Sequence, residues 1–147
     1  MDVGGDLEAR PVGRRWRSRA GGEAMSYVDG FVMPIPRKNL AAYKKMASVG
    51  AKAWKKHGAL EYFECVGDDL YPKMPGMKIA QFTTMAKAKR GETVVFSFIV
   101  YKSKAHRNAV NKKVMKEMDE RMKEHPQKMP FDMKRMAFGG FKTIVQA

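Results

Sequence analysis

The chain has 147 residues, of which 44% are hydrophobic and 30% are charged, a size and composition typical of one globular domain with its own core. No apolar run approaches the roughly 18–20 residues that cross a bilayer, which excludes a membrane-spanning protein. The single cysteine, Cys65, excludes an internal disulfide and suits a reducing compartment. We therefore expect a cytoplasmic protein without a membrane partner.

The formal net charge of +14 favours acidic partners, because a field of that sign raises their encounter rate. The lysines are scattered along two expected helices, which is more typical of a solvated surface than of a nucleic-acid reading head. There is also no RNP-like aromatic string and no zinc-finger pattern. Association with RNA or another nucleic acid is therefore the alternative function, supported by net charge alone.

Residues 1–24 differ in composition from the rest of the chain. They are rich in glycine, contain five arginines and no lysine, and show no apolar periodicity. We expect a disordered basic extension there, followed by one domain over residues 25–147. The other interpretations are an arm that contacts nucleic acid and a targeting peptide, although the acids Asp2, Asp6 and Glu8 are unusual in a targeting peptide.

The domain begins with an expected strand over residues 27–35, where side chains alternate with a period of two until two prolines end the pattern. A helix follows, because apolar residues recur at spacings of three and four up to Trp54. This stripe comprises Leu40, Tyr43, Ala47, Gly50 and Trp54. Gly58 is a suitable helix stop, since glycine tolerates the left-handed backbone conformation.

The middle of the chain predicts three more strands. Residues 60–66 form the first, a loop rich in proline follows over residues 68–78, and residues 79–85 form a weaker strand. Residues 93–101, TVVFSFIVY, are almost entirely apolar, β-branched or aromatic. That pattern predicts a strand buried on both faces.

The last third predicts a helix and a strand. Ser103 is placed to cap the helix, whose buried stripe includes Val110, Val114 and Met118. After a loop over residues 127–134, a final strand is expected over residues 135–145. Its Gly139-Gly140 pair indicates a bulge or the close approach of another backbone segment.

The order of these elements predicts an α+β fold of the ferredoxin-like βαββαβ type, with an extra strand before the third core strand. Both helices should cover one face of the sheet. We expect the other face to be apolar, with side chains drawn from Tyr27, Phe31, Tyr62, Ile99 and Phe138. Since a soluble monomer seldom exposes such a face, a two-fold homodimer that pairs the sheets is expected.

Four segments resemble a bacterial family of unknown function in the dimeric α/β-barrel superfamily, sometimes labelled RNA signal recognition particle protein. They are VDGFV at residues 28–32, GALEYFEC at 58–65, VVFSFIVYKSK at 94–104 and MPFDMKRMAFGGF at 129–141. The resemblance implies a cytoplasmic dimer without an established activity. The superfamily also contains small monooxygenases, haem-degrading enzymes and stress proteins, so it narrows the fold far more than the function.

Asp29 is the one candidate catalytic residue, because it lies between apolar neighbours in an expected interior strand. A carboxylate buried there must be paired, hydrogen-bonded or raised in pKa. It is either a general base facing a cavity or a structural ion pair, for which Arg135 is the expected partner. Glu64 and Cys65 point to opposite faces of their strand, so they cannot share a site, and we expect Cys65 to be buried as a small apolar residue.

The loop before the last strand combines Phe131, Asp132 and Arg135 within five residues. It either closes a cleft and holds the polar group of a ligand, or it is tied down by an Asp132–Arg135 pair and a core phenylalanine. The three histidines show no metal-ligand spacing, so we expect neither a metal nor a cofactor.

These observations give one leading functional hypothesis, beside the nucleic-acid alternative and a purely structural dimer. The chain is a homodimer that binds a small, partly apolar, acidic molecule in a sheet-lined pocket; in its catalytic version it is a cofactor-independent monooxygenase or isomerase. The candidate pocket residues are Tyr27, Asp29, Phe31, Tyr62, Glu64, Phe131, Asp132 and Arg135. No motif names a reaction.

Overall fold

The computed structural model describes residues 25–147, so all three interpretations of residues 1–24 lie outside the described part of the chain. Its main elements are β1 (Tyr27–Pro36), α2 (Leu40–Lys56), β2 (Glu61–Val66), α3 (Phe82–Met85), β3 (Glu92–Tyr101), α4 (Lys104–Glu124) and β4 (Ala137–Lys142). Short 3-10 turns at Arg37–Asn39 and Met133–Arg135 precede α2 and β4. Among these described elements, no helix is both long enough and apolar enough to cross a membrane.

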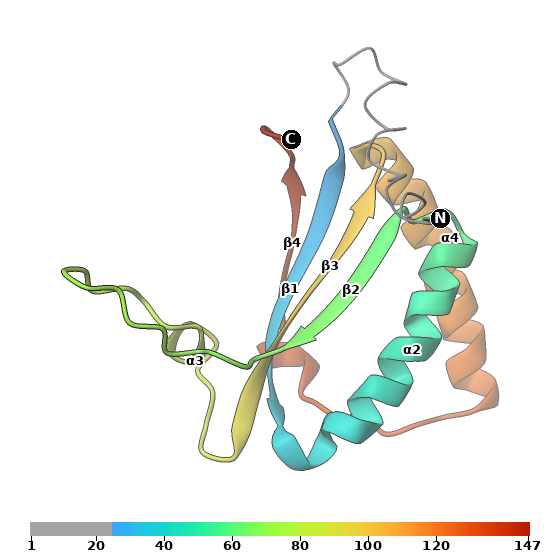
Figure 1. The fold of residues 1–147 in the computed structure, drawn as a ribbon. Helices are drawn as coiled ribbons and strands as arrows, with labels where there is room; N and C mark the ends of the chain where they lie inside the picture. Colours follow the sequence, from blue (N-terminus) through green and yellow to red (C-terminus); the bar gives the residue numbers. More distant parts are fainter. Residues whose placement is uncertain (1–24) are drawn as a thin grey trace, which may run out of the picture.

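The four strands form one antiparallel sheet in the order β2-β3-β1-β4, and α2 and α4 both lie against the same face of it (Figure 1). This is the ferredoxin-like α+β arrangement that the order of elements predicts. The two longest strands, β1 and β3, lie in the centre of the sheet. They pair along their whole lengths, from Tyr27 opposite Tyr101 to Pro36 opposite Glu92.

The expected extra strand over residues 79–85 is wrong. Residues 67–91, called the arm from here on, leave the sheet and contain only the four-residue helix α3 (Figure 1). A strand needs a neighbour for its backbone groups, whereas here the groups bond locally. The amide of Met85 donates to the carbonyl of Gln81 at 3.0 Å, and that of Ala86 donates to Phe82 at 2.8 Å.

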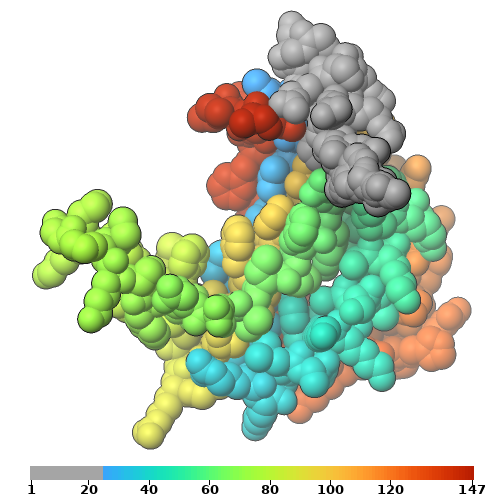
Figure 2. Space-filling model, in the orientation of Figure 1, coloured from blue at the N-terminus to red at the C-terminus, as the bar shows by residue number. Residues whose placement is uncertain are grey.

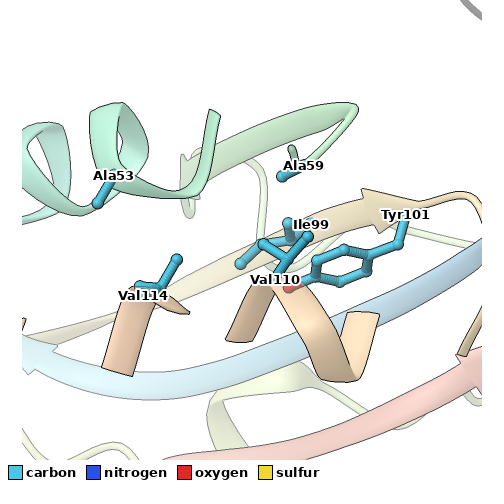
Figure 3. Packing of buried hydrophobic residues seen from close by; sticks show 6 residues of the cluster. All are labelled: Ala53, Ala59, Ile99, Tyr101, Val110 and Val114. Carbon is cyan, nitrogen blue, oxygen red and sulfur yellow. The ribbon is translucent and has the colours of Figure 1, made fainter. Parts of the chain in front are cut away.

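The space between the sheet and the helices is filled by two apolar clusters. The first joins both helices to β3 (Figure 3) and comprises Ala53, Ala59, Ile99, Tyr101, Val110 and Val114. The second lies under α2 and comprises Met33, Ile35, Tyr43, Ala47 and Val95. The expected ends of both helices are confirmed, because Gly58 has a φ of 117° after α2 and the Ser103 hydroxyl accepts from the amide of His106 at the start of α4.

The strand register decides which side chains face the helices. Phe31 packs against both core clusters, and Asp29 contacts α4, so the odd-numbered residues of β1 face the helices. The expectation that Tyr27, Phe31, Tyr62, Ile99 and Phe138 form the uncovered face is therefore wrong: all five face the helices. The uncovered face, called the open face from here on, carries Val28, Val32, Phe63, Cys65, Phe96, Phe98 and Phe141.

The uncovered face of the sheet is apolar, as expected. Its side chains, however, are those that alternate with the expected ones along each strand. Phe63, Phe96 and Phe141 are 45%, 44% and 61% exposed. Phe63 also stacks on Phe98 with ring centroids 5.0 Å apart. Cys65 lies on this face and is exposed, so the expectation that it is buried is wrong for a single copy of the chain. Four phenylalanine rings thus lie on a face that neither helix covers.

Candidate functional site

A cleft of about 500 Å³ lies where β1 begins, β4 ends and α4 begins. We call it the α4 cleft. Its lining is mixed, with hydroxyl groups, two ammonium groups and the ring of Tyr27. The lining residues are Met25, Ser26, Tyr27, Ser103, Lys104, Gly140, Lys142 and Thr143.

The ends of the two strands hold the walls of the α4 cleft in place. Tyr27 lies opposite Lys142 in the β1–β4 register, and the amide of Thr143 donates to the carbonyl of Ser26 at 3.2 Å. The hydroxyls of Ser26 and Thr143 are 2.9 Å apart. On the other side, Ser103 caps α4, whose N-terminal end carries the positive end of the helix dipole. The cleft therefore combines hydroxyl donors with positive charge from Lys104, Lys142 and the helix end.

Behind the cleft, Arg107 of α4 joins Tyr27 to the buried Asp29. Its Nη2 donates to the Tyr27 hydroxyl at 3.1 Å, and its guanidinium lies 5.1 Å from the centroid of that ring. Its Nε lies 3.2 Å from Oδ1 of Asp29, which is 1% exposed. This contact is an ion pair without hydrogen-bond geometry, and neither of its two atoms has a hydrogen-bond partner among the described residues.

The other oxygen of Asp29 accepts from Nδ2 of Asn111 at 3.3 Å. Burial raises the pKa of the Asp29 carboxyl, while Asn111, Arg107 and Tyr101 oppose that rise. Asp29 thus forms the structural ion pair that was one of its two interpretations, but the expected partner was wrong. Arg135 pairs with Glu92 instead.

The surroundings of Gly140 give a reason for glycine at this position of β4. A Cβ atom added there would lie 2.5 Å from Nη2 of Arg107 and would also collide with the ring and hydroxyl of Tyr27. A side chain at this position would force the Arg107–Tyr27 pair to shift, which glycine avoids. The register continues through both glycines without a bulge, and the close neighbours of Gly140 are side chains and not the other backbone segment that was expected.

Glu64 and Tyr62 belong to a second polar cluster, between β2 and α2. The hydroxyls of Tyr43 and Tyr62 donate to the two carboxylate oxygens of Glu64, each at 2.6 Å. The pKa of both tyrosines is raised well above the ordinary value. Burial is the largest cause, and the hydrogen bond to Glu64 is the second. This arrangement makes Glu64 an acceptor for two hydroxyls that would otherwise be desolvated without a partner.

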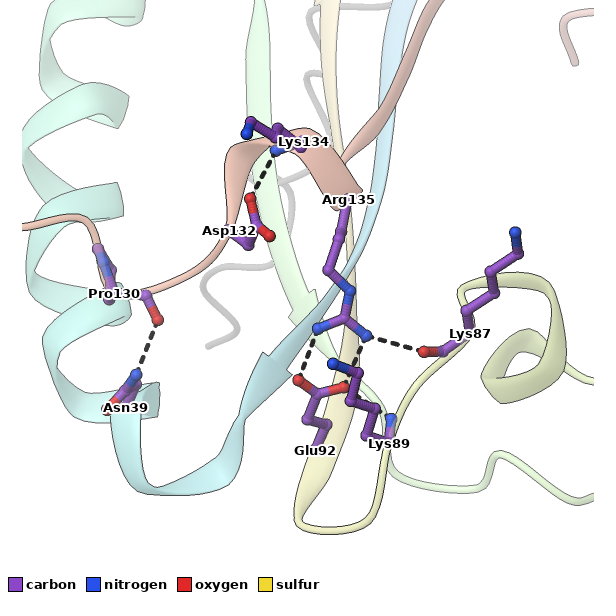
Figure 4. A network of polar contacts seen from close by, with 8 residues as sticks. All are labelled: Asn39, Lys87, Lys89, Glu92, Pro130, Asp132, Lys134 and Arg135. Carbon is purple, nitrogen blue, oxygen red and sulfur yellow. Dashed lines mark hydrogen bonds and ion pairs between the residues drawn. The ribbon is translucent and has the colours of Figure 1, made fainter.

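The loop before β4 lies at the other end of the sheet (Figures 1 and 4). Arg135 donates from both terminal nitrogens to Glu92, at 2.7 and 2.9 Å, and from Nη2 to the carbonyl of Lys87 at 2.8 Å. The pair holds the pKa of Glu92 down at about 2, mainly through the hydrogen bonds from Arg135. Asp132 accepts from the amide of Lys134 instead of pairing with Arg135, so that expected pair is wrong.

The candidate pocket residues therefore separate into four places. Tyr27 and Asp29 lie at the α4 cleft, whereas Tyr62 and Glu64 lie under α2. Phe31 packs in the core and stacks on Phe138 at 4.8 Å. Phe131, Asp132 and Arg135 lie at the far end of β1, with Phe131 edge-on to Tyr43 at 5.6 Å. The structure does not bring the loop together with Asp29.

Four residues of this region were missed from the sequence: Lys104, Arg107, Asn111 and Lys142. Arg107 and Asn111 are four apart on α4, so they lie on one helix face above β1. Asn111 also accepts from Nε1 of Trp54 at 2.9 Å and from the Tyr101 hydroxyl at 3.0 Å. A polar pair at that spacing beside the stripe through Val110 and Val114 was the available signal.

No set of three His, Cys, Asp or Glu side chains within residues 25–147 is arranged to hold a metal ion. The histidines have other contacts. Nε2 of His57 lies 2.7 Å from Glu117, and Nδ1 of His106 accepts from the amide of Lys102 at 3.0 Å. These two histidines therefore connect helices and loops.

Comparison with known proteins shows the family of this chain but names no activity. The family model described as "Protein of unknown function (DUF1428)" matches residues 26–133. Proteins named "Uncharacterized protein YbaA" from Escherichia coli (strain K12) and Shigella flexneri are each 46% identical over 121 residues, which is 82% of this chain and 98% of theirs.

A solved structure described as a dimeric ferredoxin-like protein from an uncultured marine organism is also similar. It is 10% identical and covers 84% of this chain and 99% of its own, with a TM-score of 0.44. At that score the likeness carries no weight for the assembly of the present chain. The family model, in contrast, matches most of the sequence, from before β1 to the loop before β4, and the chain belongs to the DUF1428 family.

Proposed function

We propose that this chain acts as a homodimer that binds a small, partly apolar, acidic molecule, and that the acidic group lies in the α4 cleft. The main support for ligand binding is that Lys104, Lys142 and the N-terminal end of α4 all lie at one cleft. Charge-assisted hydrogen bonds from ammonium and hydroxyl groups favour a carboxylate or a phosphate. The ring of Tyr27 offers an apolar wall beside them.

The α4 cleft replaces the pocket between paired sheets as the place for the acid. The register places two charged side chains of the described strands on the open face, Glu61 and Glu92; Glu92 is already paired with Arg135, and Glu61 would repel an acidic ligand. The candidates Tyr27 and Asp29 also face the helices, where the cleft lies. A mixed lining and a volume of about 500 Å³ are within the usual range for small-molecule sites.

The homodimer half rests on the open face. Phe63, Phe96 and Phe141 are each about half exposed there, and soluble monomers rarely leave aromatic side chains gathered in this way. The cytoplasm remains the expected location, since the free Cys65 is exposed and suits a reducing compartment.

We assign no reaction to the cleft. A general base must reach the proton that it removes, and Asp29 is only 1% exposed beneath Arg107 and Tyr27. The monooxygenase and isomerase versions of the hypothesis therefore lack a group in position. Nucleic-acid association likewise keeps only the net charge in its favour.

Two-dimensional amide NMR during a titration with benzoate, compared with benzyl alcohol as a neutral analogue, tests the binding half. We expect benzoate to shift the amides of Lys104, Lys142 and Thr143, and the alcohol to have little effect. Changing both lysines to glutamine should weaken benzoate binding about fivefold or more, since each lost exposed charge contributes up to ~1 kcal/mol. Lys112→Gln with Lys113→Gln, two exposed lysines farther along α4, is the matched control.

Equal shifts from benzoate and the alcohol, or shifts confined to other parts of the chain, would contradict the proposed site. Binding of an RNA oligonucleotide that falls steeply with added salt would instead favour the alternative function.

A further inference from the structure

The arm is the least expected feature of the fold, because it carries large apolar side chains away from the core. Six of them are between 41% and 63% exposed: Tyr71, Met74, Met77, Ile79, Phe82 and Met85. Figure 1 shows the arm projecting from the lower end of the sheet on the side opposite α2 and α4, which is the side of the open face. The arm thus places apolar side chains in the space in front of that face.

The arm has a defined direction even though its tip lies far from its own domain. At its start, the amide of Gly67 donates to the carbonyl of Val94 at 2.8 Å. At its end, Arg135 holds the Lys87 carbonyl and the carboxylate of Glu92, and the amide of Lys89 donates to that same carboxylate at 2.7 Å (Figure 4). The two ends are therefore tied to β3, and the arm is held out from the sheet.

Figure 2 shows the hollow that results, with the arm on one side and the end of β4 and the C-terminal residues on the other. The phenylalanines of the open face belong to the sheet between them. Ile144 and Val145 at the other rim are 79% and 81% exposed. One chain therefore presents both an apolar hollow and an apolar projection.

We propose that the arm of each chain packs on the open face of a second copy, so that two copies clasp each other around a two-fold axis. A two-fold interface uses the same surface on both partners, and that surface must be complementary to itself. This chain meets that requirement, because the arm and the hollow are on the same side of it. The inference rests on the proposed homodimer and names the segment that holds it together.

The exposed apolar area is sufficient for such an interface. An aromatic side chain contributes about 150–250 Å² when it is removed from water. The half-exposed phenylalanines of the open face and the six arm side chains together amount to roughly 800 Å² per chain, the size of a standard stable interface. The arm supplies more than half of that area, so the open face alone would leave a small contact.

Analytical ultracentrifugation of three full-length variants tests the clasp. Met77→Glu with Phe82→Glu changes the arm, Phe96→Glu changes the open face, and Met115→Glu changes an exposed methionine on α4 as the control. We expect a dimer for the native chain and the control. We expect the dimer dissociation constant to rise at least tenfold for the arm variant and for the open-face variant. Far-UV circular dichroism should show that all of them are folded.

The outcomes separate the clasp from the homodimer itself. If the arm variant dimerises as tightly as the native chain while Phe96→Glu is monomeric, the homodimer stands and the clasp is wrong. If the native chain is a monomer, both are wrong. Hydrogen exchange gives an independent check: amides in residues 67–91 should exchange faster in the Phe96→Glu monomer than in the native dimer, and equal rates would overturn the clasp.

Discussion

Replacing Arg107 by methionine should destabilise the domain strongly, because it leaves the Asp29 carboxylate buried without its cation. Asp29 is 1% exposed and would keep the hydrogen bond from Asn111 at 3.3 Å, which supplies no positive charge. Removing one partner of a buried ion pair costs about 3–5 kcal/mol. The Arg107 side chain is 20% exposed and its contact with Asp29 is off-axis, so we expect a loss of about 2–3 kcal/mol.

The second half of this prediction is a rescue. Asp29→Asn keeps the shape of the side chain and removes the charge, so on its own it should change stability by less than about 1 kcal/mol. Added to Arg107→Met, it should recover most of the loss, since no buried charge is then unpaired. The two changes should therefore be strongly non-additive, with a coupling of about 2 kcal/mol.

The pH dependence of the Arg107→Met loss has a defined sign. Burial raises the pKa of Asp29 above the ordinary value of 3.8, and removal of the guanidinium raises it further. An acid whose pKa is raised by folding favours the folded state when it is protonated, and this contribution disappears as the pH rises through the folded-state pKa. The loss should therefore be smaller at pH 5 than at pH 7.5.

The free energy of unfolding is measured by urea unfolding followed by circular dichroism, at one protein concentration and at both pH values. The four proteins compared are the native chain, the two single variants and the double variant. A fixed concentration is needed because dimerisation contributes to apparent stability. Additive effects of the two substitutions, or an Arg107→Met loss that is the same at both pH values, would refute the role given to this pair.

Two further predictions concern the other polar clusters. Glu64→Ala should cost about 2–3 kcal/mol by leaving the hydroxyls of Tyr43 and Tyr62 without an acceptor, and Glu64→Gln about half of that, as measured by urea unfolding. Arg135→Gln should lower the free energy of unfolding at pH 7, because the hydrogen bonds from Arg135 hold the pKa of Glu92 at about 2 in the folded chain against an ordinary value of 4.5. That contribution is present above pH 4.5 and fades as the pH falls toward 2, so the variant and the native chain should converge in acid; a constant gap would contradict it.

Much of the fold could be predicted because local signals agreed with the tertiary arrangement. The alternation in β1, the stripe in α2, the Ser103 cap and the stop at Gly58 are each set by neighbours in sequence. The segment over residues 79–85 failed for the opposite reason. Its sequence does not say what its side chains pack against, and here the backbone hydrogen-bonds to itself in α3.

The faces of the sheet could not be assigned because both carry large apolar residues. In β1, Tyr27 and Phe31 alternate with Val28 and Val32, so hydrophobicity alone does not say which set meets the helices. The polar groups of α4 decide it. Arg107 and Asn111 reach Asp29, and that contact places the odd-numbered side chains inside.

The candidate site was scattered for a related reason. Neighbours in sequence such as Asp132 and Arg135 lie close together in the chain, but Arg135 finds its partner in Glu92, 43 residues earlier. The α4 cleft combines the two ends of the domain, Ser26 and Thr143, with Ser103 at the start of α4, which no local pattern connects. Long-range register, which needs the folded sheet, brings them together.

The most direct test of the covered open face uses Cys65, the single cysteine of the chain, which lies on that face opposite Phe96. The rate at which this thiol reacts with a chromogenic disulfide reagent reports whether the face is accessible. With a second copy in place, the rate should be low at high protein concentration, rise on dilution, and be high at every concentration in Phe96→Glu. A rate that is high in the native chain and independent of its concentration would show that the face is bare.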